Sequence, residues 1–285
     1  MDMSSLPQRI IEIERFGVGE FSAAEITEKC AFVRALMDAR PRPENPHISV
    51  IVPAYKEERY ILATLRSLAE LSYAGCEFLI VSNGEPAGNP TQRIAEACGF
   101  TVLHDSVGGI ARARQTGLEA AHGEIIVMTD ADTLQPAGWL EGIIGILRDP
   151  RVRCGSGFAY ALSRSAVVRG ITALMTSSMR LQHAIDPRLL KGIFEANMFF
   201  YRADALAAGG FDASLRMGEG ITLFKKLRRP RAPFFFVDRS IAVYTSSRRP
   251  ERQGPVRWFA LMVYNGFAQT LGSKGLGPEN YPDVR

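Results

Sequence analysis

Two aspartates that follow a short apolar run are the residues of this sequence best suited to chemistry. Residues 125–128 are all apolar, and Asp130-Ala131-Asp132 follows them after one threonine. Such a run is typical of a buried strand, and the backbone turns where the strand ends, so both carboxylates can converge on one hard cation. Acids this close repel each other, and a dication or bound protons would offset the repulsion. The competing interpretation is a solvated turn, in which aspartate is common.

Alternating strands and helices lead up to this pair and predict where it lies. We expect strands at 48–52, 78–81, 100–104 and 125–128, separated by helices at 57–71, 91–98 and 110–121. This alternation implies right-handed βαβ units and a parallel sheet, in which ligands lie beyond the carboxyl ends of the strands. One rim of the sheet should therefore carry the segments 53–58, 83–89 and 130–133.

The flanking parts of the chain are less regular. Ser22 and Glu25 have the spacing of a capping box, which predicts a helix before the proline-rich segment 41–46. In the second half we expect strands at 152–162, 193–201 and 234–237, and helices at 163–185, 203–208, 220–227 and 256–270. The predicted division is a helical extension and linker at 1–46, a main domain at 47–254 with halves 47–135 and 136–254, and a C-terminal helix and tail at 255–285.

Composition limits the classes of protein to consider. The chain has 285 residues, 46% of them apolar, and a formal charge of +4, which does not indicate a dedicated nucleic-acid binder. Its four cysteines are widely spaced, which predicts buried thiols in a reducing compartment. No signal sequence or membrane span is evident, so we expect a cytoplasmic protein, with peripheral contact at the inner membrane face left open. Basic residues cluster at 225–257 and could hold a diphosphate, a phosphorylated acceptor or anionic lipid, or form a solvated face.

Several motifs, taken in order, resemble one enzyme family. They are the opening segment 48–58, the run Ala-Arg-Ala-Arg-Gln-Thr-Gly-Leu at 111–118, Asp130-Ala131-Asp132 with Trp139 after it, Gly-Gly-Phe-Asp at 209–212 followed by Gly218 and Glu219, and Thr-Ser-Ser-Arg-Arg at 245–249. Over roughly 48–254 the chain resembles a nucleotide-sugar-dependent glycosyltransferase of family 2. The resemblance implies the GT-A fold, an α/β architecture with a Rossmann-like, mostly parallel central sheet flanked by helices.

The resemblance also implies a reaction and a set of site residues. A sugar would pass from a nucleoside-diphosphate-sugar donor to a hydroxyl acceptor, which could be a saccharide, a lipid-linked compound or a small molecule. A divalent cation, Mn²⁺ or Mg²⁺, on Asp130 and Asp132 would act as Lewis acid on the diphosphate. No cysteine or histidine lies nearby in sequence, which argues against zinc. The residues expected at the donor are Pro53, Ala54, Tyr55, Glu57, Asn83, Arg114, Asp130, Ala131 and Asp132.

Each of these side chains also has a plainer interpretation. Tyr55 could stack on the base or pack within its loop, and Glu57 could cap the following helix. Arg114, which matches the arginine of the family motif, would contact the phosphates or the base with its forked donors. Arg112 could do the same. An exposed helix face is the competing interpretation for both arginines, and it suits Arg112 better than Arg114.

The sequence departs from the family pattern at two places. The second strand leads into Asn83 instead of an acidic pair that reads the base, which changes the hydrogen-bond pattern offered to the nucleotide. Gly220 stands where inverting members carry the aspartate that deprotonates the acceptor. Glu219 could serve as the acceptor-side acid or base if burial raised its pKa, or it could be a first-turn helix acid. A base elsewhere, or a reaction with retention of configuration, would also accommodate Gly220.

Two rival functions are also open. A catalytically impaired module of the same fold would bind nucleotide-sugar without turning it over, as the missing aspartate suggests. A phosphohydrolase of the haloacid-dehalogenase type also uses two aspartates after a strand. That class requires Thr or Val two residues beyond the second aspartate, usually on the first strand, whereas Thr133 follows Asp132 directly and this strand is the fourth.

Overall fold

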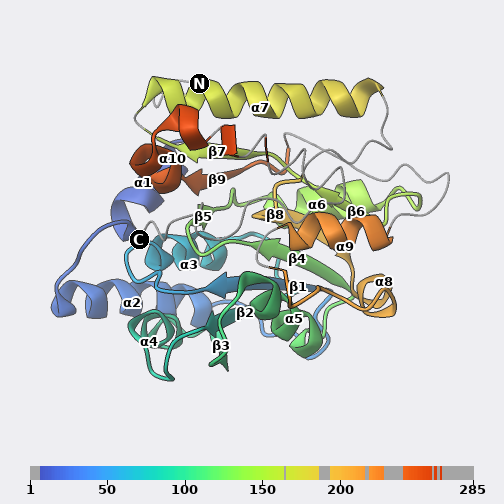
Figure 1. Ribbon diagram of the computed structural model, residues 1–285. Coiled ribbons are helices and arrows are strands. Elements are labelled where there is room, and N and C mark those ends of the chain that lie inside the picture. Colours follow the sequence, from blue (N-terminus) through green and yellow to red (C-terminus); the bar gives the residue numbers. More distant parts are fainter. Residues whose placement is uncertain are drawn as a thin grey trace.

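The computed structural model describes residues 7–163, 165–185, 193–215, 218–227 and 240–258, together with 260, 261 and 264. In this part of the chain, a six-stranded sheet lies at the centre, helices cover both of its faces, and a smaller sheet lies beside it (Figure 1). The α/β class predicted from the sequence is confirmed. No helix of the described residues combines the length and the apolar character needed to cross a bilayer.

The six-stranded sheet has the strand order β3-β2-β1-β4-β8-β6. The strands are β1 (Ile48–Ala54), β2 (Cys76–Asn83), β3 (Thr101–Asp105), β4 (Ile125–Thr129), β6 (Cys154–Ser156) and β8 (Asn197–Tyr201). β3, β2, β1 and β4 are parallel neighbours, whereas β8 runs antiparallel to both β4 and β6. A mostly parallel sheet, as predicted, therefore brings the carboxyl ends of β1, β2 and β4 to one rim.

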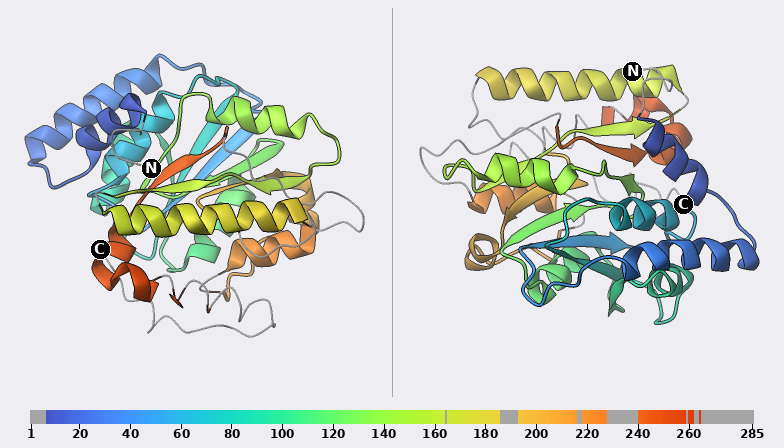
Figure 2. Two further views of the ribbon diagram at one scale, coloured as in Figure 1. Left: turned by 90° about the horizontal axis from the view of Figure 1, so that it is seen from above. Right: turned by 180° about the vertical axis from the view of Figure 1, so that it is seen from behind.

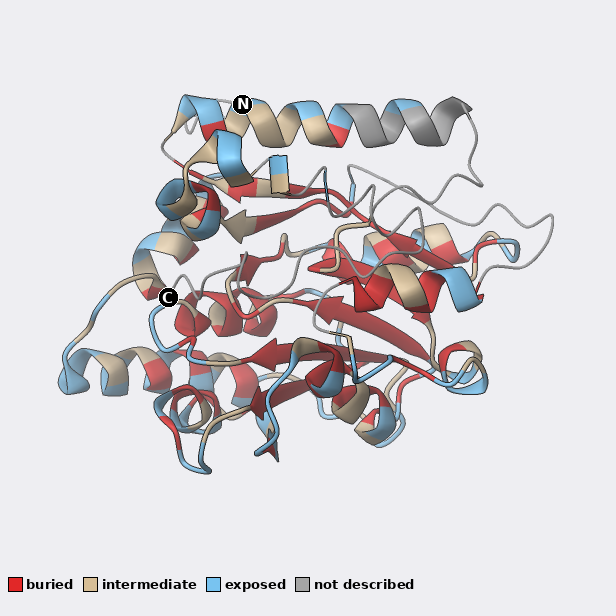
Figure 3. Cartoon of the chain, in the orientation of Figure 1, coloured by how far each residue is buried: buried red, intermediate tan, exposed pale blue. Residues whose placement is uncertain are grey.

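Each face of this sheet has its own apolar core, because alternate residues of a strand point to opposite sides. On one face, Val50 and Val52 of β1 pack with α3 (Ile61–Ala69), α4 (Pro90–Ala97) and α6 (Trp139–Leu147). On the other, Ile51 packs with α5 (Ile110–Ala120), α8 (Arg202–Ala207) and α9 (Glu219–Leu227). The central strands are buried, and β3 at the edge is more exposed (Figure 3).

A three-stranded sheet holds the segment that follows the two aspartates. Its order is β5-β9-β7, formed by β5 (Thr133–Leu134), β7 (Ala159–Leu162) and β9 (Val243–Ser246). β9 is antiparallel to β5 and parallel to β7, and it leads into α10 (Arg248–Gln253). The long helix α7 (Ala166–Ile185) packs along β7 at the outside of the molecule (Figure 2). The end of the chain thus returns to the loop that carries Asp130 and Asp132.

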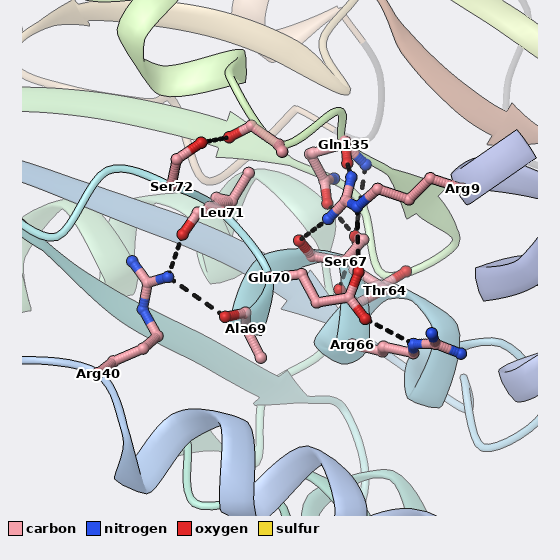
Figure 4. Close-up of polar contacts among 11 residues, drawn as sticks. Arg9, Arg40, Thr64, Arg66, Ser67, Ala69, Glu70, Leu71, Ser72 and Gln135 are labelled. Atoms are coloured by element: carbon pink, nitrogen blue, oxygen red, sulfur yellow. Dashed lines mark hydrogen bonds and ion pairs between the residues drawn. The ribbon is translucent and has the colours of Figure 1, made fainter. Parts of the chain in front are cut away.

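The N-terminal helices pack directly on the main body. Ser22 and Glu25 form the predicted capping box at the start of α2 (Ala23–Asp38). An earlier helix, α1 (Gln8–Gly17), was not expected. Figure 4 shows Arg9 of α1 reaching Glu70, with 3.0 Å between Nε and Oε2, and the carbonyl of Gln135 at 2.9 Å. The division at residue 46 stays a prediction, although α2 contributes Cys30, Val33 and Met37 to the main core.

Several expected elements differ from the structure. The single strand at 152–162 is wrong, because Gly157 and Phe158 separate β6 from β7. The helix expected from 57 begins only at Ile61, because Glu57–Tyr60 forms a turn in which the carbonyl of Glu57 accepts the N–H groups of Tyr60 and Ile61. β5, β9 and α6 were not predicted. The strand at 234–237 and most of the helix at 256–270 lie outside the described residues. All four cysteines are buried and free, as expected.

Candidate functional site

The carboxyl ends of β2, β1 and β4 lie side by side and carry the predicted donor residues. Pro53 and Ala54 end β1 and are buried, and Tyr55 follows them half-buried. Gly84 comes directly after β2 with φ of 73°, and a Cβ on it would lie 3.4 Å from the Tyr55 ring. Asn83 is buried beside it and donates a hydrogen bond from Nδ2 to the carbonyl of Gly109 at 3.2 Å. The rim therefore offers an aromatic face next to an amide.

The loop after β1 is held in one conformation by its neighbours. Lys56 has φ of 54°, a left-handed value that is uncommon for a side-chain-bearing residue. Its N–H donates to Glu85 Oε2 at 3.2 Å, and the next N–H, of Glu57, donates to Thr91 Oγ1 at 2.9 Å. Strained backbone that is fixed in this way is common at ligand sites.

Asp130 belongs to an ion-pair cluster around one buried arginine. Arg114 projects from α5 and is only 2% exposed. Its Nη2 lies 3.2 Å from Asp130 Oδ1, while Nη1 lies 3.0 Å from Glu195 Oε2 and 2.5 Å from Glu219 Oε1. Gly117 lets α5, which carries Arg114, pack closely on β1, because a Cβ at Gly117 would lie 2.4 Å from Ile51 Cγ2. A buried guanidinium needs such partners, since an unpaired buried charge is costly.

Asp132 belongs to a second cluster, around Arg248 at the start of α10. Arg248 Nη2 lies 3.2 Å from Asp132 Oδ2, and the same guanidinium binds both oxygens of Glu57 at 2.6 and 2.7 Å. The guanidinium also lies over the ring of Tyr60, 4.6 Å from its centroid. β9 fixes this arrangement, because the N–H of Ser246 donates to the carbonyl of Asp132 at 3.0 Å.

Crowding of acids shifts the protonation of two of these carboxyls. Burial, together with the negative charges of Glu57 and Asp130, raises the pKa of Asp132 to about 7 against the opposing charge of Arg248. Burial also raises the pKa of Glu219 to about 8, with the negative charge of Glu195 adding to the effect and Arg114 opposing it. Protonation of these two carboxyls thus relieves part of the crowding among the five acids that contact Arg114 and Arg248.

The donor atoms at the turn fit a hard divalent cation. The Asp130 side chain is 35% exposed and that of Asp132 13% exposed, so both reach solvent despite their arginine partners. Thr64 holds the turn between them by donating to the carbonyl of Ala131 at 2.8 Å. In the described part of the chain no set of three or more His, Cys, Asp and Glu side chains is grouped as a metal site. The protein would thus supply two carboxylates, and phosphate and water the rest, as is usual for Mg²⁺.

Several predicted side chains have different partners from those expected. Glu57 does not cap α3, because its carboxylate binds Arg248. Arg112 pairs with Asp105 at 2.7 Å and has no contact with the aspartate turn. Arg114 is enclosed by carboxylates, so a direct contact with phosphate would break these pairs. Glu219 is 1% exposed, so its side chain is enclosed in this structure.

Two residues of the site were missed or misplaced by the sequence. Glu195 was not singled out, although it stands just before the apolar strand β8 and next to the turn after β4. Arg248 was considered only as part of the basic cluster at 225–257 and of the motif at 245–249. In the structure it begins α10, after Thr245 and Ser246, which are paired in β9. The signal for Glu195 was Gly220, which leaves room for a carboxylate from elsewhere.

This fold, with two acids at the carboxyl end of a central strand, defines the GT-A class. Over residues 49–207, more than half of its length, the chain matches the family described as glycosyl transferase family 2, and it belongs to that family. This membership removes the dehalogenase-like alternative.

Curated relatives are similar over parts of the chain. The putative glycosyltransferase EpsH of Bacillus subtilis is 34% identical over 103 residues, which cover 34% of this chain and 28% of EpsH. The pre-mycofactocin glycosyltransferase of Mycobacterium tuberculosis is 27% identical over 207 residues, which cover 68% of this chain and 43% of that protein. The chain therefore spans less than half the length of these relatives.

Solved structures share the fold at low identity. The mannosyltransferase PcManGT from Pyrobaculum calidifontis, in complex with GDP-Man and Mn²⁺, has a TM-score of 0.59 and 20% identity, covering 94% of this chain and 78% of PcManGT. Residues 1–349 of Staphylococcus aureus TarS have a TM-score of 0.54 and 17% identity, covering 78% of this chain and 65% of that one. At these identities the likeness establishes the fold.

Proposed function

We propose that this chain transfers a sugar from a nucleoside-diphosphate-sugar donor to a hydroxyl acceptor, with a divalent cation held by Asp130 and Asp132. The observation that carries the proposal is the charge imbalance at the rim. Three carboxyl groups contact Arg114 and two contact Arg248. With Glu219 protonated, four acids still face two arginines, which leaves negative charge next to the partly exposed aspartate turn. A dication would offset that charge and favour a bound diphosphate.

The neighbouring residues have proposed roles in holding the donor. Pro53, Ala54 and Tyr55 would form the surface for the nucleoside. The Tyr55 ring, whose centroid lies 5.1 Å from Lys56 Nζ, would stack on the base, and Asn83 Oδ1 would accept a hydrogen bond from the nucleoside. Ala131 would keep the turn narrow between the two acids. When bound, the cation would supply Lewis-acid stabilisation to the diphosphate as the bond to the sugar breaks.

The two arginines would act on the acids, each in a different way. Arg114 fixes the orientation of Asp130 and stays enclosed during the reaction. Arg248 lies against Asp132 at the surface of the site, with 10% of its side chain exposed, so its charge is available to a diphosphate that approaches the turn.

Sugars linked to uridine diphosphate or guanosine diphosphate are the first donors to examine. Structural neighbours have been solved with UDP, with UDP-GlcNAc, and with GDP-Man and Mn²⁺. These ligands belong to those proteins, and their common feature is a nucleoside diphosphate. Asn83 can accept or donate to a base edge, so the rim alone accommodates either base.

A thermal-shift experiment with UDP, GDP and Mn²⁺ tests the donor site. Either nucleotide should stabilise the protein only with Mn²⁺, because the cation would offset the negative charge at the aspartate turn. Nucleotide at about 100 times its Kd would add roughly 2.7 kcal/mol to the free energy of unfolding. Asp132→Asn should abolish the Mn²⁺-dependent part. Asp38→Asn on the exposed face of α2 is the matched control and should keep it. A full Mn²⁺-dependent shift in Asp132→Asn would overturn the proposed site.

The second candidate function is a module that binds nucleotide-sugar without turnover, and Gly220 is the observation that favours it. Incubation with UDP-GlcNAc or GDP-mannose distinguishes the two functions through the release of nucleoside diphosphate, with water or added saccharides as acceptor. Release that requires Mn²⁺ supports the transferase. Mn²⁺-dependent binding without release supports the module.

A further inference from the structure

The side chain that Gly220 lacks is replaced in space by another residue. A Cβ built on Gly220 would lie 2.8 Å from Glu195 Oε1 and 2.9 Å from Glu195 Cγ. The N–H of Gly220 donates to the same Oε1 at 2.9 Å. Glu195 therefore places its carboxylate in the volume where a side chain at position 220 would begin.

The sheet brings Glu195 to the acceptor side of the aspartate turn. Asn197, the first residue of β8, pairs with Thr129, the last residue of β4. Glu195 lies two residues before that pair and Asp130 one residue after it, so both are at the same end of two adjacent strands (Figure 1). Arg114 binds both side chains, which confirms that they share one site.

Exposure separates the two glutamates that contact Arg114. The Glu195 side chain is 24% exposed, whereas that of Glu219 is 1% exposed. A base that removes a proton from an acceptor must come within hydrogen-bond reach of it. Glu195 has the solvent access that such an approach requires, while Glu219 is enclosed.

We propose that Glu195 is the general base of the transfer reaction, supplying the carboxylate that position 220 does not carry. This inference rests on the proposed function. Arg114 Nη1 and the Gly220 N–H each hold one carboxylate oxygen, so the group is oriented from both sides. Glu219 is then a positioning residue that keeps Arg114 in place.

The step balances without another reactant. Glu195 accepts the proton of the acceptor hydroxyl as that oxygen forms a bond to the anomeric carbon of the donor sugar. The bond from the anomeric carbon to the diphosphate oxygen breaks, and its electron pair leaves with the nucleoside diphosphate. Glu195 afterwards returns the proton to water. A direct displacement of this kind inverts the configuration at the anomeric carbon.

Glu195→Gln tests the role directly. It keeps the size of the side chain and removes the basic oxygen, so kcat for nucleoside diphosphate release from UDP-GlcNAc or GDP-mannose should fall about 10²–10⁴-fold. The Mn²⁺-dependent thermal shift with UDP or GDP should stay at the wild-type value. Glu119→Gln on the exposed face of α5 is the matched control and should keep wild-type kcat.

A relocation variant separates catalysis from a structural role. Glu195→Ala should lose turnover, and adding Gly220→Asp should restore at least tenfold of it, because the new carboxylate enters the space that Glu195 vacates. If the role of Glu195 were purely structural, Gly220→Asp would restore no turnover. A double variant that folds and binds donor but recovers no turnover therefore overturns the proposal.

The remaining outcomes distinguish this proposal from the one on which it rests. Wild-type protein that binds donor but releases no nucleoside diphosphate overturns the transferase itself. If the wild type turns over and Glu195→Gln has the same kcat, only the base assignment is overturned. A product that retains the anomeric configuration by NMR overturns the same assignment.

Discussion

At the scale of single residues, one guanidinium connects the two sides of the proposed reaction. Arg114 contacts Asp130, which would hold the cation, and Glu195, which would face the acceptor. Breaking a buried ion pair by removing one partner typically costs about 3–5 kcal/mol, so this geometry resists rearrangement. In the proposed reaction, the distance between the donor and acceptor sides would thus be set by a residue that touches neither substrate.

Glu219 should make the stability of the protein depend on pH. An unfolded glutamate loses its proton near 4.5, whereas burial keeps Glu219 protonated up to a pKa of about 8. Between these values the folded state binds more protons than the unfolded state. Its stabilising contribution, roughly a few kcal/mol, is therefore complete below about pH 4.5 and is lost as the pH rises through 8.

Urea unfolding between pH 5 and 8.5 in the presence of a chelator measures this contribution. Glu219→Gln cannot ionise, so its free energy of unfolding should fall less steeply with pH than that of the wild type. Comparing the two proteins removes the contribution of Asp132, which both retain. Parallel pH profiles for the two proteins would contradict the assignment.

The residues that the sequence identified share a local signal. Asp130, Asp132, Pro53 and Asn83 each follow an apolar run, and the rule that ligands lie beyond the carboxyl ends of parallel strands places them together. Glu195 carries no such signal, because an antiparallel strand brings it beside β4 from far along the chain. Gly220 signals only that a carboxylate could come from elsewhere. The position of Glu195 beside it follows from strand pairing, which a single sequence does not reveal.

At the scale of elements, glycine determines how closely the helices approach. Gly17 ends α1, and a Cβ on it would lie 2.3 Å from the backbone nitrogen of Ala63 in α3. Gly210, with φ of 63°, lies against Gln115 of α5, whose Oε1 accepts the N–H of Phe211 at 2.8 Å. These contacts attach α1 and the segment at 209–212 to helices that border the rim.

Gly17→Ala should destabilise the protein by about 1–3 kcal/mol, because the added methyl group forces the backbones of α1 and α3 apart. Gly145→Ala in the exposed part of α6 is the matched control, since no atom lies within 4 Å of the new methyl group. It should stabilise the protein by about 1 kcal/mol through helix propensity. Chemical unfolding measures both, and equal effects of the two substitutions would refute the close packing of α1.

The elements predicted well are those whose own residues determine their form. β1 and β4 are apolar runs between turns, and α2 has a capping box and one buried stripe. α6 was missed because six of its nine residues are Trp, Leu or Ile, so no polar face marks its period. β5 has two residues and exists only through its pairing with β9, which a local pattern cannot show.

At the scale of the whole molecule, the core joins the N-terminal helices to the sheet. Cys30, Val33 and Met37 of α2 belong to the same buried cluster as Val50 of β1 and Trp139 of α6. Elements that share a core unfold together, whereas an appendage on the surface opens at a lower cost. The sequence predicted residues 1–46 as an extension of the main domain. Whether they unfold together with that domain is a question that an unfolding experiment can answer.

Thiol labelling can measure that cooperativity, because the four buried cysteines lie in different parts of the chain. Cys30 is on α2 and Cys154 on β6, so they report on the N-terminal helices and on the far edge of the six-stranded sheet. We expect both to become reactive at the same urea concentration, since α2 cannot leave without exposing the shared core. A pulse of a thiol reagent followed by digestion and mass spectrometry resolves each site. Labelling of Cys30 well below the urea concentration that exposes Cys154 would show that the N-terminal helices open independently of the sheet that carries the site.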